Sequence, residues 1–253
     1  MPIALITGAS AGLGAEFARQ LARRRADLVL VARSEDALAA LATELREEHG
    51  VAVEVIVADL AVADDVDRVA ARFADAANPI DLLINNAGFG LPLRFADNEI
   101  DDEVRHLRVH VEASMRLMHA TIRAMRGRGG RIINVASVAG FISRSTYSAC
   151  KAWVIGFSRW ATAEYAADGV TVTALCPGFT HTTFHERMGM AQGDEGVPSW
   201  MWLDATDVVR EGLRDAALGK AVSVPSLRYK VIVALTSLLP ASVTARVARR
   251  GRI

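Results

Sequence analysis

The amino-acid sequence predicts an α/β fold, a single domain built on a doubly wound, parallel, seven-stranded sheet. Short β-branched runs alternate with longer amphipathic stretches, which is typical of a parallel sheet covered by helices on both faces. The chain has 253 residues and is 51% apolar, enough for a layered core in one domain. Open sheets of this kind bind ligands beyond the carboxyl ends of their strands, and polar or glycine-rich motifs follow six of the expected strands.

Seven segments have the length and composition of strands, namely 3–7, 28–32, 52–58, 82–85, 131–136, 171–176 and 221–224. Helical periodicity between them predicts helices over 12–25, 35–49, 63–76, 101–126, 146–167 and 206–219. Right-handed crossovers would place these helices on alternating faces as the strand order reverses.

The charge balance and the cysteine count exclude several classes of protein. Lys plus Arg and Asp plus Glu are each 29, so there is no net positive field to attract nucleic acid. The two cysteines, Cys150 and Cys176, are too few for a disulfide framework or a metal cluster, and both are expected in the core of a cytoplasmic protein. The N-terminal apolar run has the length of a strand and no charged leader, which argues against a secretion signal.

The C-terminal region 226–253 is expected to be a helical extension. Its apolar run 231–239 is well short of the ~20 residues that span a membrane. Four arginines follow, so one hypothesis is peripheral contact with an anionic membrane surface on the inner face. The alternative is a helix packed on the domain with a solvated end.

The clearest chemical signal is the pair Tyr147 and Lys151, ten residues after Ser137. In a helix, a separation of four places both side chains on one face. A cation within about 4–6 Å favours the phenolate and lowers the pKa of a tyrosine, which would let Tyr147 exchange a proton with a carbonyl or alcohol oxygen near neutral pH. Ser137 could hold the same oxygen. The alternative for Tyr147 and Lys151 is an exposed helical pair without a catalytic role.

A glycine-rich turn follows the first expected strand. Gly8, Gly12 and Gly14 would let the backbone turn tightly and approach a pyrophosphate at the start of the next helix, so a dinucleotide is the predicted ligand. Ser10 could add a hydroxyl contact, and Leu13 lies within the same turn. Such turns also occur as simple helix entries.

The end of the second strand predicts the choice of nicotinamide cofactor. An acidic residue there would bind the ribose hydroxyls of NAD, whereas an arginine can neutralise an added 2′-phosphate. The chain has Arg33 and Ser34 at this point, which favours NADP(H) over NAD(H), although Glu35 and Asp36 follow closely. Arg33 could also be an ordinary surface residue at a helix entry.

These motifs in this order resemble the short-chain dehydrogenase/reductase family. The resemblance covers roughly residues 3–182 and rests on 7–14, Asp59, 85–88, Ser137, Tyr147 with Lys151, and Pro177, Gly178 and Thr182. It implies a Rossmann-type domain, reversible hydride transfer at a carbinol carbon without a metal, and a homodimer or homotetramer formed through the helices near 101–126 and 146–167.

The resemblance also implies roles for individual residues. Tyr147 looks like the general acid/base, Ser137 the anchor of the substrate oxygen, and Lys151 both a modulator of the tyrosine and a ligand of the nicotinamide ribose. Asp59 would approach the adenine and Thr182 the carboxamide. The remaining residues expected to contact the cofactor are Leu60, Asn86, Ala87, Gly88, Pro177, Gly178 and Thr180.

The chain departs from the family pattern at two points. The family usually has an asparagine that supports a proton relay where this chain has His110, which could serve as a second proton station, hold water or a backbone carbonyl, or simply pack. The separation of Ser137 from Tyr147 is a few residues shorter than usual, so the loop 138–146 is expected to be tight and to reshape one wall of the substrate pocket.

The segment 183–203 is expected to form a substrate-binding loop or lid. Its apolar residues suit a lipid-like or bulky ketone, although they could equally be core or oligomer contacts; they are Phe184, Met188, Met190, Trp200, Met201 and Trp202. The stretches 135–140 and 177–187 also resemble an actinobacterial-type branch of the family that includes reductases of long-chain 3-oxo lipids.

The leading hypothesis is an NADPH-dependent carbonyl reductase acting on a small-molecule ketone or the matching alcohol. One alternative is a non-catalytic NADP-binding redox sensor or assembly subunit, although a pure sensor would need only the cofactor residues. Another alternative is a steroid or sugar alcohol dehydrogenase acting in the oxidative direction, against which the choice of NADP(H) weighs.

Overall fold

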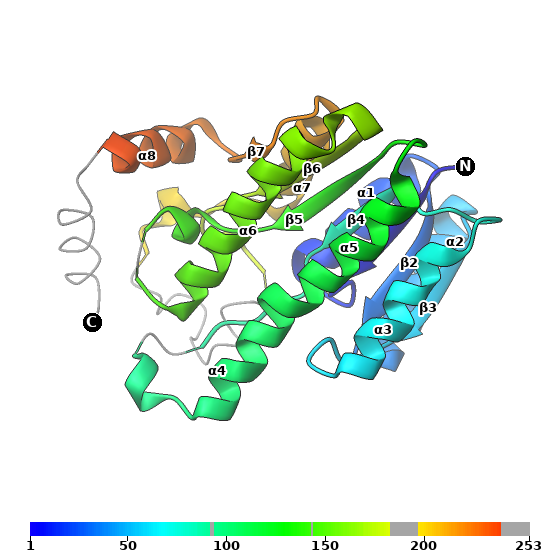
Figure 1. The fold of residues 1–253 in the computed structure, drawn as a ribbon, viewed down its shortest axis with the longest axis horizontal. Coiled ribbons are helices and arrows are strands. Elements are labelled where there is room, and N and C mark those ends of the chain that lie inside the picture. The colour runs from blue at the N-terminus through cyan, green and yellow to red at the C-terminus, as the bar shows by residue number, and fades with distance from the viewer. Residues whose placement is uncertain (92–93, 143, 183–196, 239–253) are drawn as a thin grey trace.

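The computed structural model describes residues 1–91, 94–142, 144–182 and 197–238, and they form a three-layered α/β domain (Figure 1). Its seven-stranded sheet has the order β3-β2-β1-β4-β5-β6-β7, and every adjacent pair is parallel. The order reverses between β1 and β4, so the predicted doubly wound topology is confirmed.

The seven observed strands agree with the predicted segments to within one or two residues at each end. They are β1 Ile3–Thr7, β2 Asp27–Ala32, β3 Val53–Val57, β4 Leu82–Asn85, β5 Gly130–Val135, β6 Val170–Leu175 and β7 Val222–Ser223. β2 and β6 are buried almost throughout, as expected of central strands covered on both faces.

The helices divide between the two faces of the sheet (Figure 1). On one face lie α1 Gly12–Arg23, α2 Glu35–His49 and α7 Ala205–Ala217, whose apolar residues share a core with alternate residues of β1 and β2. On the other lie α3 Ala63–Ala71, α5 Ser114–Met125 and α6 Thr146–Glu164, whose apolar residues share a second core with residues of β1, β2, β4, β5 and β6. α3 ends early and continues as the 3₁₀ turn Arg72–Ala74.

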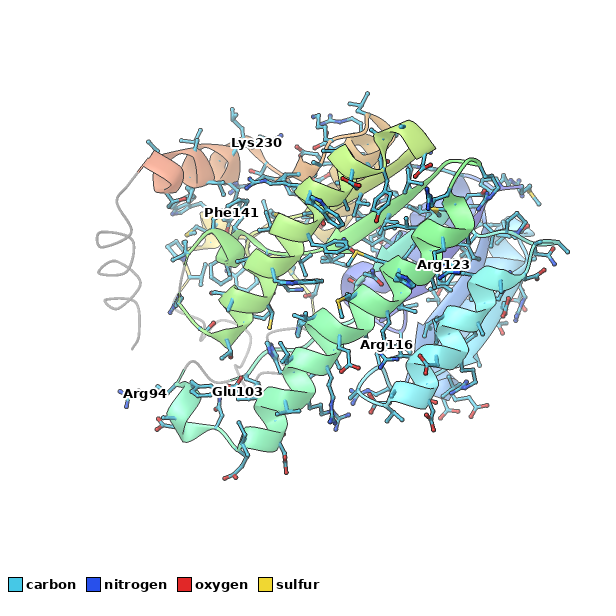
Figure 2. All side chains as sticks on the ribbon, viewed as in Figure 1. Arg94, Glu103, Arg116, Arg123, Phe141 and Lys230 are labelled. Atoms are coloured by element: carbon cyan, nitrogen blue, oxygen red, sulfur yellow. The ribbon has the colours of Figure 1, made fainter. Side chains whose placement is uncertain are left out.

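The single helix expected over 101–126 has an interruption. It consists of α4 Ile100–Leu107, the π-helical segment Arg108–Ala113 and α5. The three pieces form one continuous rod in Figure 1, and in Figure 2 Glu103 lies on its α4 end with Arg116 and Arg123 on α5. A π-helical turn widens the helix and frequently marks a functional position, and His110 lies within this one.

The C-terminal helix α8 Leu227–Leu238 follows β7 (Figure 1) and packs against the 3₁₀ turn Val138–Phe141. Residues 239–253 of the expected extension 226–253 lie outside the described residues. Among the described residues, no helix has the length and apolar character needed to cross a bilayer. Cys150 and Cys176 are free and buried, as predicted.

Candidate functional site

The glycine turn after β1 is fastened to the end of β4 by Asn86. The Asn86 amide donates to the carbonyls of Thr7 (2.9 Å) and Gly8 (3.2 Å). The Thr7 hydroxyl in turn accepts from the backbone N–H groups of Asn86 and Ala87. A Cβ on Gly14 would lie 2.2 Å from the Gly8 carbonyl oxygen, so only glycine permits this packing. The Asn86 side chain therefore shapes the turn.

The start of α1 has the character of an anion site. Its N-cap residue, Ala11, supplies no side-chain hydrogen bond, so the first N–H groups of the helix are available to a phosphate. Gly12 has a φ of 55° and faces Thr182, whose Cβ would lie 3.3 Å from a Cβ at position 12. The fold thus brings Thr182, from the segment after β6, against the glycine turn, with Ser10 and Leu13 half-buried in the same region.

At the end of β2, Arg33 and Ser34 are both exposed, and Ser34 is the N-cap residue of α2 without a side-chain capping bond. Their side chains are open to an incoming ligand. After β3, Leu60 is buried, and the carboxylate of Asp59 is already engaged. It accepts from Arg105 of α4 at 2.7 Å and from the Ala61 N–H at 3.0 Å. The interaction with Arg105 is not apparent from the sequence.

Ser137, Tyr147 and Lys151 lie together beyond the carboxyl end of β5. Ser137 precedes the 3₁₀ turn Val138–Phe141 and accepts from the Ala139 N–H at 3.1 Å, and its side chain is also hydrogen-bonded to Tyr147. The Lys151 ammonium lies 5.5 Å from the centroid of the Tyr147 ring and donates to the Val135 carbonyl at 2.6 Å. Lys151 is 5% exposed and Tyr147 is partly buried, so the two do not form an exposed helical pair.

The loop between Ser137 and Tyr147 packs closely on α6, in keeping with its short length. A Cβ on Gly140 would lie 2.7 Å from Ile155 and 2.8 Å from the carbonyl carbon of Lys151. The Ser145 hydroxyl caps α6 by accepting from the Ser148 N–H. Capping fixes the first turn of the helix and hence the direction of Tyr147.

The expected lowering of the tyrosine pKa is not found. Burial raises the pKa of Tyr147 to about 12, and the hydrogen bond to Ser137 only partly opposes it. Burial also lowers the pKa of Lys151, to about 8. The prediction was wrong because it counted the lysine charge and omitted the desolvation of both groups. At neutral pH the phenol is therefore protonated and can donate a hydrogen to an oxygen in the site.

His110 contacts the backbone of the segment that follows β4. Its Nε2 atom lies 2.7 Å from the Phe89 carbonyl oxygen, and its Cε1 atom would lie 2.5 Å from a Cβ on Gly88. Burial lowers the pKa of His110 well below its usual value, so the ring is neutral. Of the alternatives for this residue, contact with a backbone carbonyl is confirmed. Its Nδ1 atom is buried without a hydrogen-bond partner in the described structure.

A second histidine, His106, lies beside His110, which a search for i, i+4 pairs on this helix would have found. The ring centroids are 4.3 Å apart, and those of His110 and Tyr147 are 5.6 Å apart. Phe89 contacts both histidine rings. Burial lowers the pKa of His106 to about 4. Two neutral imidazoles and a phenylalanine therefore form one wall beside the tyrosine.

The segment after β6 carries four residues of the predicted cofactor set. The Pro177 carbonyl accepts from the Val138 N–H at 3.0 Å, and the Thr180 hydroxyl donates to the Gly178 carbonyl at 3.0 Å. Thr182 completes the set at the glycine turn. In the expected loop 183–203, Phe184, Met188 and Met190 lie outside the described residues, whereas Trp200 is exposed and Met201 and Trp202 are partly buried.

The arrangement suits proton transfer coupled to a ligand held along the carboxyl edge of the sheet. A protonated phenol and a serine hydroxyl, both partly buried, meet a buried lysine ammonium beyond β5. The glycine turn, with helix N–H groups available to a ligand, lies two strands away at the end of β1, where the sheet reverses.

Comparison with known proteins agrees with this geometry. The sequence pattern of the short chain dehydrogenase family matches residues 2–192. The chain is 36% identical over 187 residues to the 3-oxoacyl-[acyl-carrier-protein] reductase FabG of Vibrio harveyi, covering 71% of this chain and 74% of that protein.

Two solved structures are similar over nearly the whole chain. A short-chain dehydrogenase from Sphingobium yanoikuyae in complex with NADPH has a TM-score of 0.85 and 34% identity, covering 95% of this chain and 96% of that one. The bulky-bulky ketone specific alcohol dehydrogenase from Comamonas testosteroni has a TM-score of 0.80 and 31% identity, covering 95% of both chains. The chain belongs to the short chain dehydrogenase family and is an oxidoreductase of that family.

Proposed function

We propose that the protein is an NADP(H)-dependent reductase of a ketone with an apolar or lipid-like body. The observation that carries this proposal is the cluster of Ser137, protonated Tyr147 and buried Lys151, at the same edge of the sheet as a glycine turn suited to a phosphate. The relatives support it, because one reduces 3-oxoacyl groups by its name, one is specific for bulky ketones and one was solved with NADPH. Similarity to an actinobacterial branch stays a prediction.

The residues present fit a dinucleotide phosphate. The pyrophosphate would lie at the start of α1 against the N–H groups that follow Ala11, near Gly12 and Ser10. Arg33, exposed at the end of β2, would bind the 2′-phosphate with Ser34. Thr182 and the Pro177–Gly178 turn would lie on the nicotinamide side. When bound, the cofactor supplies the hydride.

The protein side of the reaction is proton transfer and orientation. Ser137 holds the ketone oxygen, and the Tyr147 hydroxyl gives that oxygen its proton as the carbon is reduced. A phenol with a pKa of about 12 suits the reductive direction, since it is protonated at neutral pH. Lys151 supports the tyrosine ring and would bind the nicotinamide ribose. His110 stabilises the Gly88–Phe89 backbone, and its unpartnered Nδ1 atom is the group through which it would join a relay.

The chain is also proposed to form a homodimer or homotetramer, as members of the family typically do. A surface groove of about 690 Å³ lies between α5 and α6 and is lined by Met115, Ile122, Phe157 and Trp160. Met115 and Trp160 are 44% and 49% exposed, an apolar surface suited to a second copy. Phe157 stacks on Trp153 and meets Trp160 edge to face, so three aromatic rings contact one another on this side of α6.

The test of the enzymatic function is Tyr147→Phe, with Tyr165→Phe at the other end of α6 as the matched control. We expect ketone reduction to fall by about two to four orders of magnitude in Tyr147→Phe, the usual contribution of a general acid. NADPH binding, followed by fluorescence titration, should survive in both variants. Full activity in Tyr147→Phe would overturn the proposal in favour of a cofactor-binding sensor, and tighter binding of NADH than of NADPH would overturn the cofactor assignment.

A further inference from the structure

Tyr229, on the C-terminal helix α8, is buried at a junction that no motif of the sequence indicates. It is 1% exposed. Its hydroxyl donates to the Met201 carbonyl at 2.8 Å and accepts from the Phe179 N–H at 3.1 Å. One side chain thus bonds to both arms of the segment that leaves β6 and returns to α7.

The same ring packs against the glycine of the Pro177–Gly178 turn. A Cβ on Gly178 would lie 2.0 Å from the Tyr229 Cζ atom, so the ring occupies the space that a side chain at position 178 would need. Glycine is required here by close packing of the aromatic ring. Gly178 is also one of the residues expected to lie on the nicotinamide side of the cofactor.

The two arms are joined to each other just beyond the tyrosine. Thr180 and Leu203 form a parallel bridge, in which Leu203 N–H donates to Phe179 (2.8 Å) and His181 N–H donates to Leu203 (3.0 Å). The rings of His181 and Trp202 stack across the same junction with centroids 4.8 Å apart. Thr182, which contacts the glycine turn, is the next residue after this bridge.

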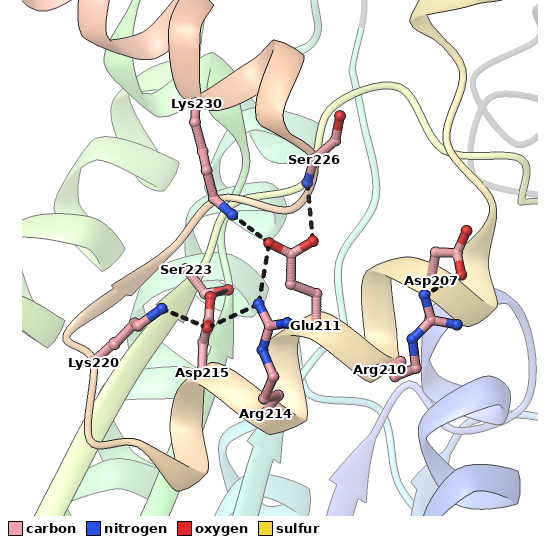
Figure 3. Close-up of polar contacts among 9 residues, drawn as sticks. All are labelled: Asp207, Arg210, Glu211, Arg214, Asp215, Lys220, Ser223, Ser226 and Lys230. Atoms are coloured by element: carbon pink, nitrogen blue, oxygen red, sulfur yellow. Dashed lines mark hydrogen bonds and ion pairs between the residues drawn. The ribbon is translucent and has the colours of Figure 1, made fainter.

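The beginning of α8 is itself fixed by charge (Figure 3). Glu211 of α7 accepts from the Ser226 N–H at 3.1 Å and from the Lys230 ammonium, so it bonds on both sides of Tyr229 in the sequence. Burial opposes ionisation of Glu211, but these hydrogen bonds hold its pKa below the usual value. Ser226 has a φ of 74°, a strained value for serine that this bond stabilises. These contacts hold the first turn of α8, and with it Tyr229, against α7.

We propose that Tyr229 is a positioning residue that aligns the cofactor-side arm Gly178–Thr182 with the returning arm Met201–Leu203. Through it, the C-terminal helix sets the geometry in which cofactor and ketone meet. This inference rests on the proposed reductase function. A phenol suits the task because a single hydroxyl both donates to one arm and accepts from the other.

The test is Tyr229→Phe, which keeps the ring and removes both hydrogen bonds. The matched control is Thr236→Val, which removes a hydroxyl of the same helix that donates to the Val233 carbonyl one turn earlier. Hydrogen exchange followed by mass spectrometry should show exchange at Phe179 and Leu203 faster by about tenfold in Tyr229→Phe, the loss expected for one to two net hydrogen bonds. Exchange across β6 should not change.

Kinetics and binding test the consequence. In Tyr229→Phe, the Kd for NADPH and the KM for a bulky aryl ketone should each rise about fivefold while kcat stays within about twofold. A merely structural role would lower the melting temperature and the active fraction without changing Kd or KM. Glu211→Gln, which loosens the start of α8 without touching the phenol, should change the exchange in the same direction by a smaller factor.

Each outcome decides the inference. Unchanged exchange at Phe179 and Leu203 would show that the two arms do not depend on Tyr229. Faster exchange with Kd and KM equal to those of Thr236→Val would show that their alignment does not matter for the reaction. If the unmodified protein reduces no ketone, the proposed function fails on its own, and exchange together with the NADPH Kd, neither of which needs turnover, still decides the role of Tyr229.

Discussion

At the scale of single residues, burial dominates the electrostatics of the site. Burial shifts the pKa values of the tyrosine, the lysine and the two histidines toward their neutral forms, although Lys151, with a pKa of about 8, still carries its charge at neutral pH. Two interactions oppose this effect of burial on the pKa values and are smaller: the hydrogen bond between Ser137 and Tyr147 and the negative charge of Glu103 near His106. The site is thus prepared to give a proton to a ketone oxygen, in agreement with the reductive direction proposed.

His106 provides a residue-scale prediction of pH dependence. Its pKa is lowered from 6.5 to about 4, so on acidification the unfolded chain takes up a proton before the folded chain does. Stability contributed by the neutral ring is therefore present above pH 6.5 and is lost as the pH falls from 6.5 to about 4. Among the described residues, the titratable groups around it are Glu103, Cys150, His110, Tyr147 and Lys151.

Replacing the ring should remove this loss. In His106→Leu, the fall in the free energy of unfolding between pH 6.5 and 5 is expected to be smaller by about 2 kcal/mol than in the unmodified protein. Urea denaturation at the two pH values measures it, and His119→Leu, at an exposed position on α5, is the control. An unchanged pH dependence would mean that His106 is protonated in the folded chain.

At the scale of elements, two acid–lysine pairs attach α7 to the chain that follows it (Figure 3). Asp215 is buried and accepts from Lys220 at 2.7 Å and from Ser223 of β7 at 2.8 Å. Glu211 pairs with Lys230 of α8 and has a side chain that is 20% exposed. The two lysine side chains are similarly exposed, at 48% and 43%.

Because the two lysines are similarly exposed, replacing each of them compares the burial of their acidic partners. Lys220→Met removes the nearest cation from the buried Asp215 carboxylate, leaving Arg214 at 3.5 Å, and should lower the free energy of unfolding by about 2 kcal/mol. Lys230→Met removes the nearest cation from the more hydrated Glu211, leaving Arg214 at 3.7 Å, and should cost under about 1 kcal/mol. Urea denaturation of the two variants at neutral pH gives both values. Equal costs would show that the burial of the acid does not govern these contacts.

At the scale of the whole molecule, the prediction concerns the proposed self-association of the chain. Trp160→Asp places a charge in the apolar groove between α5 and α6 and should shift the protein toward the monomer in analytical ultracentrifugation. Leu218→Asp, at a 67% exposed apolar position after α7, is the control and should leave the assembly unchanged. A Trp160→Asp variant that sediments like the control would assign the interface to another surface.

Local pattern was enough to predict the fold and the strand ends that carry the site. Strand composition, helix periodicity and the glycine turn depend on neighbouring residues, so the sequence determined the seven strands, the order of motifs along them and the residues Ser137, Tyr147 and Lys151. Boundaries differed where tertiary packing overrides propensity, as in the π-helical turn around His110.

Only the tertiary structure decided the surroundings of these residues, and hence their pKa values and contacts. Contacts between segments that are distant in the chain set these properties. They include His110 with Phe89, Asp59 with Arg105, and Tyr229 with Phe179 and Met201. The raised pKa of Tyr147 likewise results from burial by the surrounding elements. Spacing specifies which groups share a helix face, but desolvation depends on every element packed around them. The sequence therefore determined which groups can react, and the packing of the fold decided their protonation and alignment.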